Sequence, residues 1–444
     1  MIKNQSFYSR KLFSICVLLS SLLFSTTILA LETPIQAWEI SKRNNPSLKA
    51  LQSRIEVSRY KLKQINAMAL PSLRASTGYT ALSDEPAAIF ALAPGQVTAV
   101  PMKEKEFSFS SLTLTVPLFS SGQLTNAVKA QDFIIGSDKA SYSSVLMDLK
   151  KHITESYVQI LKLEEKRAAS TAYVSSLQNH HKNIGSLLAA GMVLKSDLLA
   201  ANATLAKAEL QKKQLDNGLR QARKNYNRLL GRDLDTEFVL TPIKKIPITG
   251  TLEELFDEAI QNNQQLQSLD LKRKALTYTK KVFHAKDLPQ VALVAGYSYE
   301  DNQYQQNKDM LSASLVLNWD FDFGINRHQA NQFGAQAKEL QHMQTDMRQQ
   351  LKLGLSGLLE NHRLSEAATK STFLALQQAE EYKRTVENRY QSGLAIQAEV
   401  LAAHALLLSS ESGFFDAKYG TLLSAISILH ITGTFGQNSI NRGP

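Results

Sequence analysis

Apolar residues repeat at helical spacing over an unusually long segment of the chain. From Gly122 to about Ala190 they follow one heptad register, interrupted by polar residues such as Ser156 and His181. The members of this register are Leu146, Leu149, Ile153, Ile160, Leu163, Val174, Leu177, Ile184 and Leu188. The pattern predicts an imperfect coiled-coil helix over 122–190. At about 1.5 Å per residue, such a helix would be a rod of roughly 100 Å.

Four much shorter segments alternate between apolar and polar residues. Every second residue is apolar from Val291 to Tyr299, and the same holds from Leu311 to Phe321. Period two is typical of a β-strand with one apolar face. We therefore predict strands over 73–82, 107–118, 290–300 and 310–321. In the second of these the alternation slips after Ser110, which indicates a β-bulge.

The chain contains an internal duplication. Asn44 recurs as Asn262, 218 residues later, whereas Gly191 recurs as Gly393, only 202 residues later. Repeats of this kind define the organisation of a fold before any single element does. The second copy is thus 16 residues shorter than the first, and we expect most of the loss after Tyr297, between its two strands.

The duplication divides the chain into two similar halves. We predict a first repeat over 31–230, an equatorial linker over 231–250, a second repeat over 251–433 and a tail over 434–444. Each repeat has the order helix-strand-strand-helix-helix. The predicted helices cover 33–67, 122–190, 194–230, 251–285, 325–390 and 397–431. Thr33 with Gln36, and Thr251 with Glu254, can form capping boxes where each repeat begins.

The lengths of these helices suggest how they stack. Each of the shorter helices is about half as long as the rod over 122–190. We expect 194–230 to stack end to end on 251–285, and 397–431 on 33–67. Two continuous rods and two composite rods would then lie side by side, with the linker at mid-height.

The N-terminus has the features of a targeting segment. Lys3, Arg10 and Lys11 precede an apolar run that ends near Ala30. This predicts a secretory signal peptide over 1–30, with a retained anchor helix as the alternative. The only cysteine, Cys16, lies inside this segment, so the rest of the chain has no disulfide or cysteine-ligated metal.

Charge and motifs exclude several classes of function. The formal net charge is +10, but the Lys and Arg residues are scattered, which favours solvated helix faces over a nucleic-acid partner. The nine histidines are dispersed, and no nucleotide-binding loop, metal-binding motif or nucleophile motif is present. The sequence therefore predicts neither an enzyme nor a bound cofactor or metal.

The four predicted strands have the length of tilted membrane-spanning strands. A spanning sheet must close, because an open edge in lipid leaves backbone groups unsatisfied at several kcal/mol each. Four strands are too few to close a barrel, so the chain needs copies of itself, and a homotrimer supplies twelve strands. Tyr79, Tyr297 and Trp319 lie near strand ends, where interfacial aromatic girdles occur. The alternative is a soluble protein whose small sheet packs on its helices.

Over about residues 31–433, the chain resembles the TolC-like outer-membrane efflux proteins. The resemblance rests on the doubled element order, the openings LETPIQAWEISKRNNPSLKA and TLEELFDEAIQNNQQLQSL, the strand exit LTVPLFSSGQL and two glycine turns. It implies an α+β membrane protein in the Gram-negative outer membrane: a trimeric twelve-stranded barrel continued by a twelve-helix periplasmic tunnel. It also implies two further partners, a periplasmic adaptor and an inner-membrane pump, in addition to outer-membrane lipid.

The resemblance also suggests roles for individual residues near the end of the tunnel. Tyr390 matches the family's gating tyrosine, Asp197 an acidic partner, and Glu399 a member of an acidic ring at the constriction. The pattern departs from the family at Ala395, where relatives carry a gating arginine, and at Ala402, where a second acidic residue would stand. The closed state is therefore expected to be held differently, or less tightly.

The two glycine turns carry apolar residues where polar ones are usual. Gly191 and Gly393 can supply the left-handed conformation that ends a helix, and Ser196 can cap the helix that follows the first turn. The turn residues are Met192, Val193, Leu194, Leu394, Ala395 and Ile396. We interpret them as docking tips for an adaptor. The alternative is that neighbouring tips bury these residues against one another.

Asp320 and Asp322 lie near the inner end of the last strand, opposite Trp319 and Phe321. They are candidates for acidic rings in the lumen that would favour cations, with a simple turn at the barrel exit as the alternative. The favoured function is a passive exit duct for an efflux pump. A type I protein-secretion duct and a periplasmic coiled coil without a pore remain alternatives.

Overall fold

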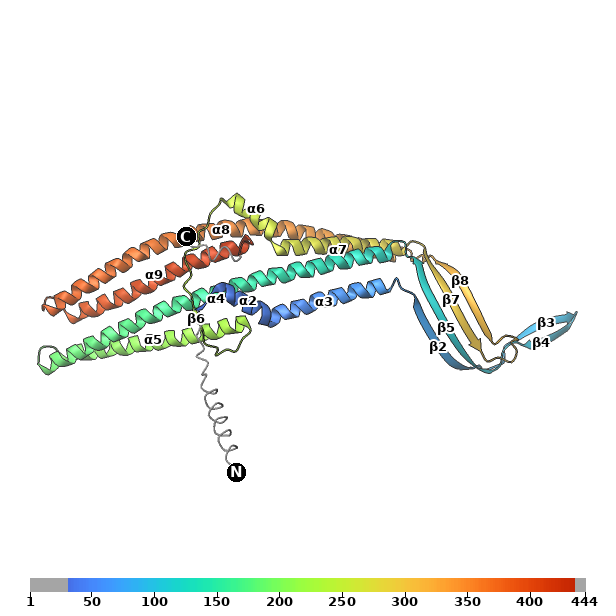
Figure 1. Cartoon of the computed structure of the whole chain (residues 1–444), viewed down its shortest axis with the longest axis horizontal. Helices are drawn as coiled ribbons and strands as arrows, with labels where there is room; N and C mark the ends of the chain where they lie inside the picture. Colours follow the sequence, from blue (N-terminus) through green and yellow to red (C-terminus); the bar gives the residue numbers. More distant parts are fainter. Residues whose placement is uncertain (1–30, 436–444) are drawn as a thin grey trace, which may run out of the picture.

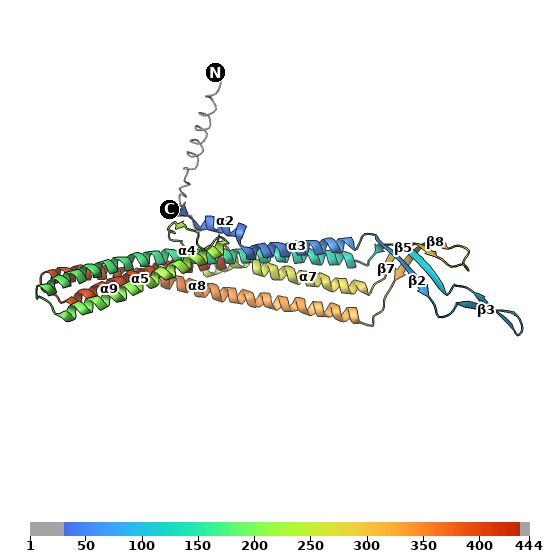
Figure 2. The same cartoon turned by 90° about the horizontal axis from the view of Figure 1, so that it is seen from below.

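The computed structural model describes residues 31–435, and they form an elongated molecule with long helices and a small sheet at one end (Figures 1 and 2). The signal peptide predicted over 1–30 and the tail beyond residue 435 lie outside the described residues. None of the described helices combines the length and the apolar character that crossing a membrane requires.

Apart from one hairpin, the two halves of the chain contain corresponding helices and strands in the same order. The first half has α2 (Pro34–Asn44), α3 (Pro46–Ala67), β2 (Ser72–Ala81), β3 (Ala87–Ala93), β4 (Gln96–Pro101), β5 (Glu106–Phe119), α4 (Gln123–Ala189) and α5 (Lys195–Leu230). The second has α6 (Leu252–Asn262), α7 (Gln264–Lys286), β7 (Gln290–Glu300), β8 (Asp309–Asn318), α8 (Ile325–Gln391) and α9 (Gln397–Ile431). Only the first half has the hairpin β3–β4, which the sequence pattern did not predict. It accounts for the greater length of that half.

The first helix of each repeat is broken, contrary to the continuous helices predicted over 33–67 and 251–285. Asn45 has extended backbone angles because Pro46 follows it, and its side chain accepts from the Ser47 amide at 2.9 Å. Asn263 caps α7 in the same way, accepting from the Leu266 amide at 2.8 Å. The capping boxes predicted at Thr33 and Thr251 are confirmed.

The predicted end-to-end stacking of the short helices is wrong. The Asn45 side-chain amide donates to the Leu229 carbonyl at 3.0 Å, which places the end of α5 at the start of α3. The Asn262 amide donates to the Thr432 carbonyl at 3.2 Å, which places the end of α9 at the start of α7. Each composite rod is thus made within one repeat. The helix lengths are nearly equal and therefore could not distinguish the two pairings.

Helix order follows strand order across the molecule. The strands lie in the order β2-β5-β7-β8, and α3, α4, α7 and α8, which adjoin them in the chain, pack in the same order. In the half of the molecule away from the sheet, the helices pack in the order α5, α4, α9 and α8 (Figure 1). The layer is one helix thick, so each chain is a curved wall rather than a closed bundle.

The bulge predicted at Ser110 is absent. The pairing of β5 with β2 runs without a shift from Glu106 to Thr115, and the register shift lies instead between Pro117 and Phe119, opposite β7. The apolar pattern slips because the apolar side of β5 changes. Phe107 lies on the face opposite Leu112, while the strand itself stays regular.

The two faces of the sheet differ in composition. One row across the four strands is Ala75, Leu112, Tyr297 and Leu311, all apolar or aromatic. The next row, on the opposite face, is Ser76, Ser111, Ser298 and Met310. The large apolar side chains of the first face are exposed in the single chain. β2 and β8 are unpaired on their outer sides within the described sheet.

The main hydrophobic core lies at mid-length, where the chain's two halves meet. The short strand β1 (Leu31–Glu32) pairs with β6 (Val239–Leu240), and Trp38 packs on Phe435 with ring centroids 5.0 Å apart. Glu32 is buried there, accepting from the Tyr226 hydroxyl at 2.5 Å and from Arg232 at 2.7 Å. A buried carboxylate held by both an ion pair and a hydroxyl ties the linker to the helices.

The joint between α5 and α3 predicts a selective effect of added methyl groups. Gly231 has φ of +69°, and a Cβ there would lie 2.9 Å from the Asn44 backbone. We expect Gly231→Ala to lower the free energy of unfolding by roughly 1–3 kcal/mol. Gly218→Ala, at an open position within α5, should be neutral or stabilise by up to about 1 kcal/mol. Thermal unfolding followed by circular dichroism compares them, and equal melting temperatures would contradict the joint.

Candidate gating and docking site

The two helical hairpins end in turns of the same geometry. Gly191 and Gly393 have φ of +73° and +72°. The Met192 amide donates to the Leu187 carbonyl at 2.9 Å, and the Leu394 amide donates to the Arg389 carbonyl at 2.7 Å. This six-to-one bond is the Schellman motif, which satisfies carbonyls left free at a helix end.

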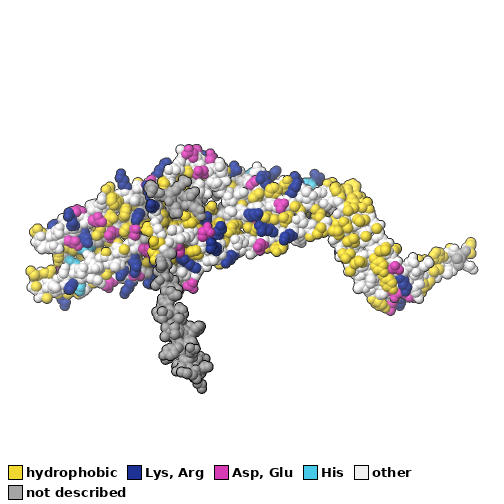
Figure 3. Space-filling model, in the orientation of Figure 1, with side chains coloured by type: hydrophobic (Ala, Val, Ile, Leu, Met, Phe, Trp, Pro, Cys, Tyr) yellow, Lys and Arg dark blue, Asp and Glu magenta, His cyan; other side chains and the backbone are white. Residues whose placement is uncertain are grey.

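The tips present apolar side chains to solvent. Met192, Leu194, Leu394 and Ile396 are 72%, 70%, 69% and 65% exposed, and Figure 3 shows hydrophobic side chains at the end of the α4–α5 hairpin. The middle residues of the turns, Val193 and Ala395, are partly covered. Within one chain, therefore, neighbouring tips do not bury the four outer residues against one another.

Asp197, not Ser196, caps the helix after the first turn. Its carboxylate accepts from the Leu194 amide at 3.1 Å, and Leu194 occupies the cap position. Asp197 also marks a connection between the hairpins, because the Gln397 side-chain amide donates to its carbonyl at 2.8 Å. An acidic group in the first turn of a helix is stabilised by the backbone dipoles.

Glu399 lies in the first turn of α9, at the place that corresponds to Asp197. Its carboxylate is 3.9 Å from the Arg389 guanidinium, which also donates to the Leu394 carbonyl at 3.0 Å. The sequence analysis did not single out Arg389 or Gln397. Arg389 supplies a cation close to Ala395, where relatives are expected to carry an arginine. Its position beside Tyr390, four residues before the turn glycine, was the available signal.

Tyr390 packs between the hairpins. It is half-buried against Val386, Val400 and Ala403, and its ring centroid is 5.7 Å from that of His180. Burial, and then the negative charge of Asp197, raise the pKa of the Tyr390 hydroxyl. No hydrogen bond between described residues joins Tyr390 to Asp197, so charge and packing relate the two.

Two buried histidines, His180 and His404, lie close to Tyr390. His404 Nδ1 is 3.1 Å from the Ser176 hydroxyl, and its Nε2 is 3.0 Å from Glu387. His180 is also buried, and its Nε2 has no hydrogen-bond partner among the described residues. Burial lowers the pKa of both imidazoles, and for His404 it outweighs the attraction of Glu387. Neutral rings therefore hold this contact between α4, α8 and α9 at neutral pH.

The two acidic candidates near the sheet have different surroundings. Asp322 accepts from the Gly324 amide at 3.0 Å and from the Asn326 amide at 2.8 Å, so it supports the start of α8. Asp320 is exposed. Because β8 ends at Asn318, the strand periodicity that placed both on one face does not extend to them.

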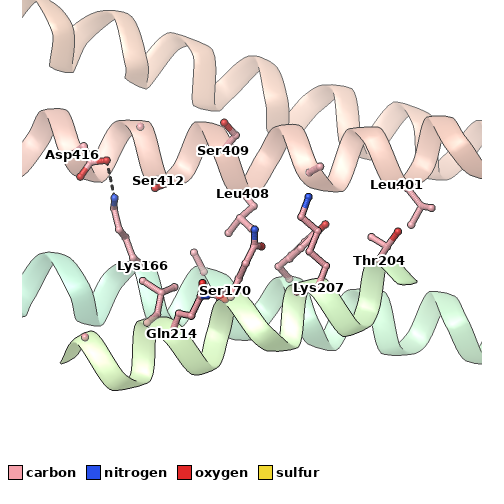
Figure 4. Close-up of a pocket in the computed structure, with 18 of the residues that line it drawn as sticks. Lys166, Ser170, Thr204, Lys207, Gln214, Leu401, Leu408, Ser409, Ser412 and Asp416 are labelled. Atoms are coloured by element: carbon pink, nitrogen blue, oxygen red, sulfur yellow. Dashed lines mark hydrogen bonds and ion pairs between the residues drawn. The ribbon is translucent and has the colours of Figure 1, made fainter. Parts of the chain in front are cut away.

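A groove separates the α4–α5 hairpin from α9 in the half of the molecule that lies away from the sheet (Figure 4). Its volume is about 1240 Å³. The α9 side carries small residues: Ala402, Ala405, Ser409, Ser412 and Gly413. Lys166 of α4 crosses to Asp416 of α9 at 2.7 Å, so an ion pair joins the hairpins across the groove.

Comparisons with known proteins identify the family. The family model described as "Outer membrane efflux protein" matches residues 39–232 and 255–434. This chain belongs to the outer membrane efflux protein family. The resemblance seen in the sequence is thereby confirmed. No curated protein sequence matches it.

Solved structures of outer-membrane channels have the same fold as this efflux protein. VceC of Vibrio cholerae is 16% identical, with a TM-score of 0.73 over 90% of this chain and 96% of that chain. CmeC of Campylobacter jejuni is 16% identical, with a TM-score of 0.74 over 90% and 85%. MtrE of Neisseria gonorrhoeae, solved in an open state, is 14% identical, with a TM-score of 0.71 over 90% and 88%.

Family membership places this efflux protein in the outer membrane, with its helices forming a large periplasmic part. The family is a non-enzymatic transport component. Among residues 31–435 no group of three or more His, Cys, Asp or Glu side chains could hold a metal ion. The described residues that do cluster, at the tips and below them, are gating and docking candidates.

The buried histidines predict that acid loosens the tips. A histidine whose pKa is lowered on folding stabilises the fold above its unfolded value of 6.5, and this stability is lost as pH falls below it. His180 faces Glu387, and His404 faces Ser176, Glu387, Lys383 and His180. Amide exchange near Leu187 and Val400 should therefore accelerate below about pH 6.5, after correction for intrinsic rates.

Substitution separates this effect from general acid sensitivity. His404→Gln keeps a polar side chain that does not titrate, so the acid-dependent acceleration should shrink at the tips. His152→Gln, at an exposed histidine on α4, is the matched control and should change nothing. Unchanged acid sensitivity in His404→Gln would count against the role of this pair.

Proposed function

We propose that three copies of this chain form a twelve-stranded barrel in the outer membrane, continued by twelve helical rods in the periplasm. The observation that carries the proposal is the pair of unpaired edges, β2 and β8, on a sheet with an exposed apolar face. In lipid each unsatisfied backbone group costs several kcal/mol, so the edges of neighbouring copies must pair. Three copies of four strands close such a ring.

The arrangement of helices supports the same assembly. Because helix order follows strand order, a ring of sheets continues directly into a ring of helices. The side of the sheet rich in Ser and Thr would face the lumen and the apolar side the lipid. The duct supplies a protein-walled path, and the energy for transport comes from an inner-membrane pump that connects through a periplasmic adaptor.

The exposed tips are the proposed docking surface for the adaptor. Six turns in a trimer would present a rim of apolar side chains: Met192, Val193, Leu194, Leu394, Ala395 and Ile396, held by Gly191 and Gly393. Such a rim in water is typical of an interaction site.

Tyr390, Asp197 and Glu399 are the proposed gating group. Tyr390 and the buried histidines join the hairpins near their tips, and the groove beside α9 leaves room for the hairpins to move relative to one another once the ion pairs across it break. Arg389 would take the place of the missing arginine through a loose, exposed pair with Glu399, at 3.9 Å, which leaves the carboxylate open to other cations. Asp320 is retained as an acidic lumen candidate, whereas Asp322 is assigned to the helix start.

A type I protein-secretion duct is an alternative with the same architecture, because the cargo is chosen by the pump. A periplasmic coiled coil without a pore is the alternative of another class. Trimers that dissociate only on heating in denaturing gels, together with single-channel conductance in planar bilayers, would support the duct. A stable monomer in membrane-free extract would contradict both the barrel and the docking rim.

The docking proposal predicts the effect of one charge at a tip. Leu394→Asp places a carboxylate on the proposed rim, and we expect roughly a tenfold loss of chemical crosslinking to the adaptor because burying an unpaired charge is costly. The trimer yield should not change. Leu234→Asp, at an exposed position in the linker, is the control and should crosslink normally. Normal crosslinking of Leu394→Asp would overturn the docking role.

The gating proposal predicts sensitivity to multivalent cations. A ring of three Glu399 carboxylates should bind such cations and reduce conductance, and Glu399→Ala should remove most of this block. Glu381→Ala, at an exposed and ion-paired position on α8, is the control and should keep it. If Glu399→Ala is blocked like the parent channel, Glu399 does not form the constriction.

A further inference from the structure

The hairpin β3–β4 is an apolar element with no partner in the chain. From Pro86 to Pro101 the sequence contains no charged residue. The strands pair from Ala87↔Pro101 to Ala93↔Gln96, and Gly95, with φ of +89°, makes the turn possible. Only the first repeat has this segment, because the second joins its strands through residues 301–308.

Both faces of the hairpin are apolar. Ile89 and Val97 lie on one face and are 73% and 70% exposed. Phe90 and Val100 lie on the other and are 50% and 42% exposed. An ordinary surface hairpin has one polar face, and an isolated two-stranded hairpin is marginally stable in water. Both faces of this one therefore require a cover.

The hairpin lies beyond a charged collar at the outer end of the sheet. Lys103 pairs with Glu300 at 2.9 Å, and Lys308 pairs with Asp301 at 2.6 Å. Figure 3 shows basic and acidic side chains gathered at the bend, with a tapering end of the molecule extending past them. Charged pairs mark the point where a spanning sheet leaves the hydrocarbon, so the hairpin is on the aqueous side.

The base of the hairpin is held firmly enough to set its direction. Asn302 is fully buried, and its side-chain amide donates to the Met102 carbonyl at 3.2 Å. The Met102 amide in turn donates to the Pro86 carbonyl at 2.7 Å. The connection of the second repeat thus holds both ends of the hairpin, which projects away from the helices (Figures 1 and 2).

We propose that the hairpins of three copies pack on one another over the outer mouth of the barrel and form an apolar cap. This inference rests on the proposed trimer. In a threefold ring each copy has two neighbours, and the hairpin has two apolar faces, one for each neighbour. The hairpin also follows β2, the edge strand that would pair with β8 of the next copy, so it emerges at the seam between copies.

The dimensions allow the hairpins to meet. Twelve strands about 4.8 Å apart and tilted by about 40° enclose a barrel of roughly 12 Å radius. The seven residues of β3 span about 23 Å at 3.3 Å per residue, which exceeds that radius. The cap would be a second constriction, apolar and distant from the periplasmic tips, of the kind that gates by excluding water.

Paired cysteines test the cap, because each face should meet the opposite face of a neighbour. In a Cys16→Ser background, the double variant Ile89→Cys/Val100→Cys carries one thiol on each face, too far round the hairpin to bond within one chain. After mild copper–phenanthroline oxidation of whole outer membranes, we expect covalent dimers and trimers. Each single variant should give roughly tenfold less, because a disulfide needs Cα atoms within about 7 Å.

Controls distinguish failure of the cap from failure of the trimer. Gln306→Cys, on the exposed connection of the second repeat, should give no crosslink. Heat-dissociable trimers without crosslinks in the double variant would overturn the cap and leave the duct intact. No trimer at all would overturn both. If trimers form without crosslinks, protection of both thiols from a water-soluble maleimide would assign the hairpin to lipid instead. Crosslinks of equal yield in the single variants would overturn the face-to-face arrangement.

Discussion

The constraint on which the structure depends is the hydrogen bonding of the sheet's two outer strands. β2 and β8 each present a row of backbone groups that nothing in the described chain satisfies. In water such edges are a risk of aggregation, and in hydrocarbon they are forbidden. The apolar face of the same sheet excludes water as its natural surrounding. In the proposed trimer, the need to pair these edges determines the number of copies, the closed ring and the path through it.

The helices depend on this constraint through their order. Each of the four strands of the sheet adjoins a helix in the chain, so in the proposed trimer a closed ring of strands imposes a ring of helices without a separate rule for helix assembly. This explains why the helical wall can be one layer thick.

Much of this was predictable from the sequence, because glycine and asparagine mark the ends of elements. Gly191 and Gly393 end long helices, and the position of the extra residues of the first half follows from two different repeat offsets. The stacking of α5 on α3 was not predictable from length, although Gly231 and Gly433 lie 202 residues apart and each fits against an asparagine. The predicted bulge at Ser110 was wrong. In a sequence, a strand whose apolar residues move from one face to the other gives the same pattern as a strand with one extra residue.

The candidate site was only partly accessible to sequence reasoning. Asp197, Tyr390 and Glu399 followed from resemblance, but a resemblance cannot reveal Arg389, whose guanidinium lies 3.9 Å from the Glu399 carboxylate and which we propose compensates for the missing arginine. The buried contact of His180 with Tyr390 depends on how α4 and α8 face one another, and dispersed histidines give no sign of it. The cap of the first tip changed from Ser196 to Asp197 because the helix begins at Lys195, one residue before Ser196.

The breaks at Asn45 and Asn263 make two of the four helical rods in each chain discontinuous, and the other two remain continuous. α4 and α8 are covalently continuous at mid-length, whereas α5 meets α3, and α9 meets α7, through non-covalent contacts of a side-chain amide and a glycine. A twist applied at the periplasmic end is therefore transmitted to the membrane by the continuous helices α4 and α8. In the proposed trimer, the rods α5–α3 and α9–α7 can slip at their joints, so the periplasmic end of the tunnel can change diameter while the strands keep their registers.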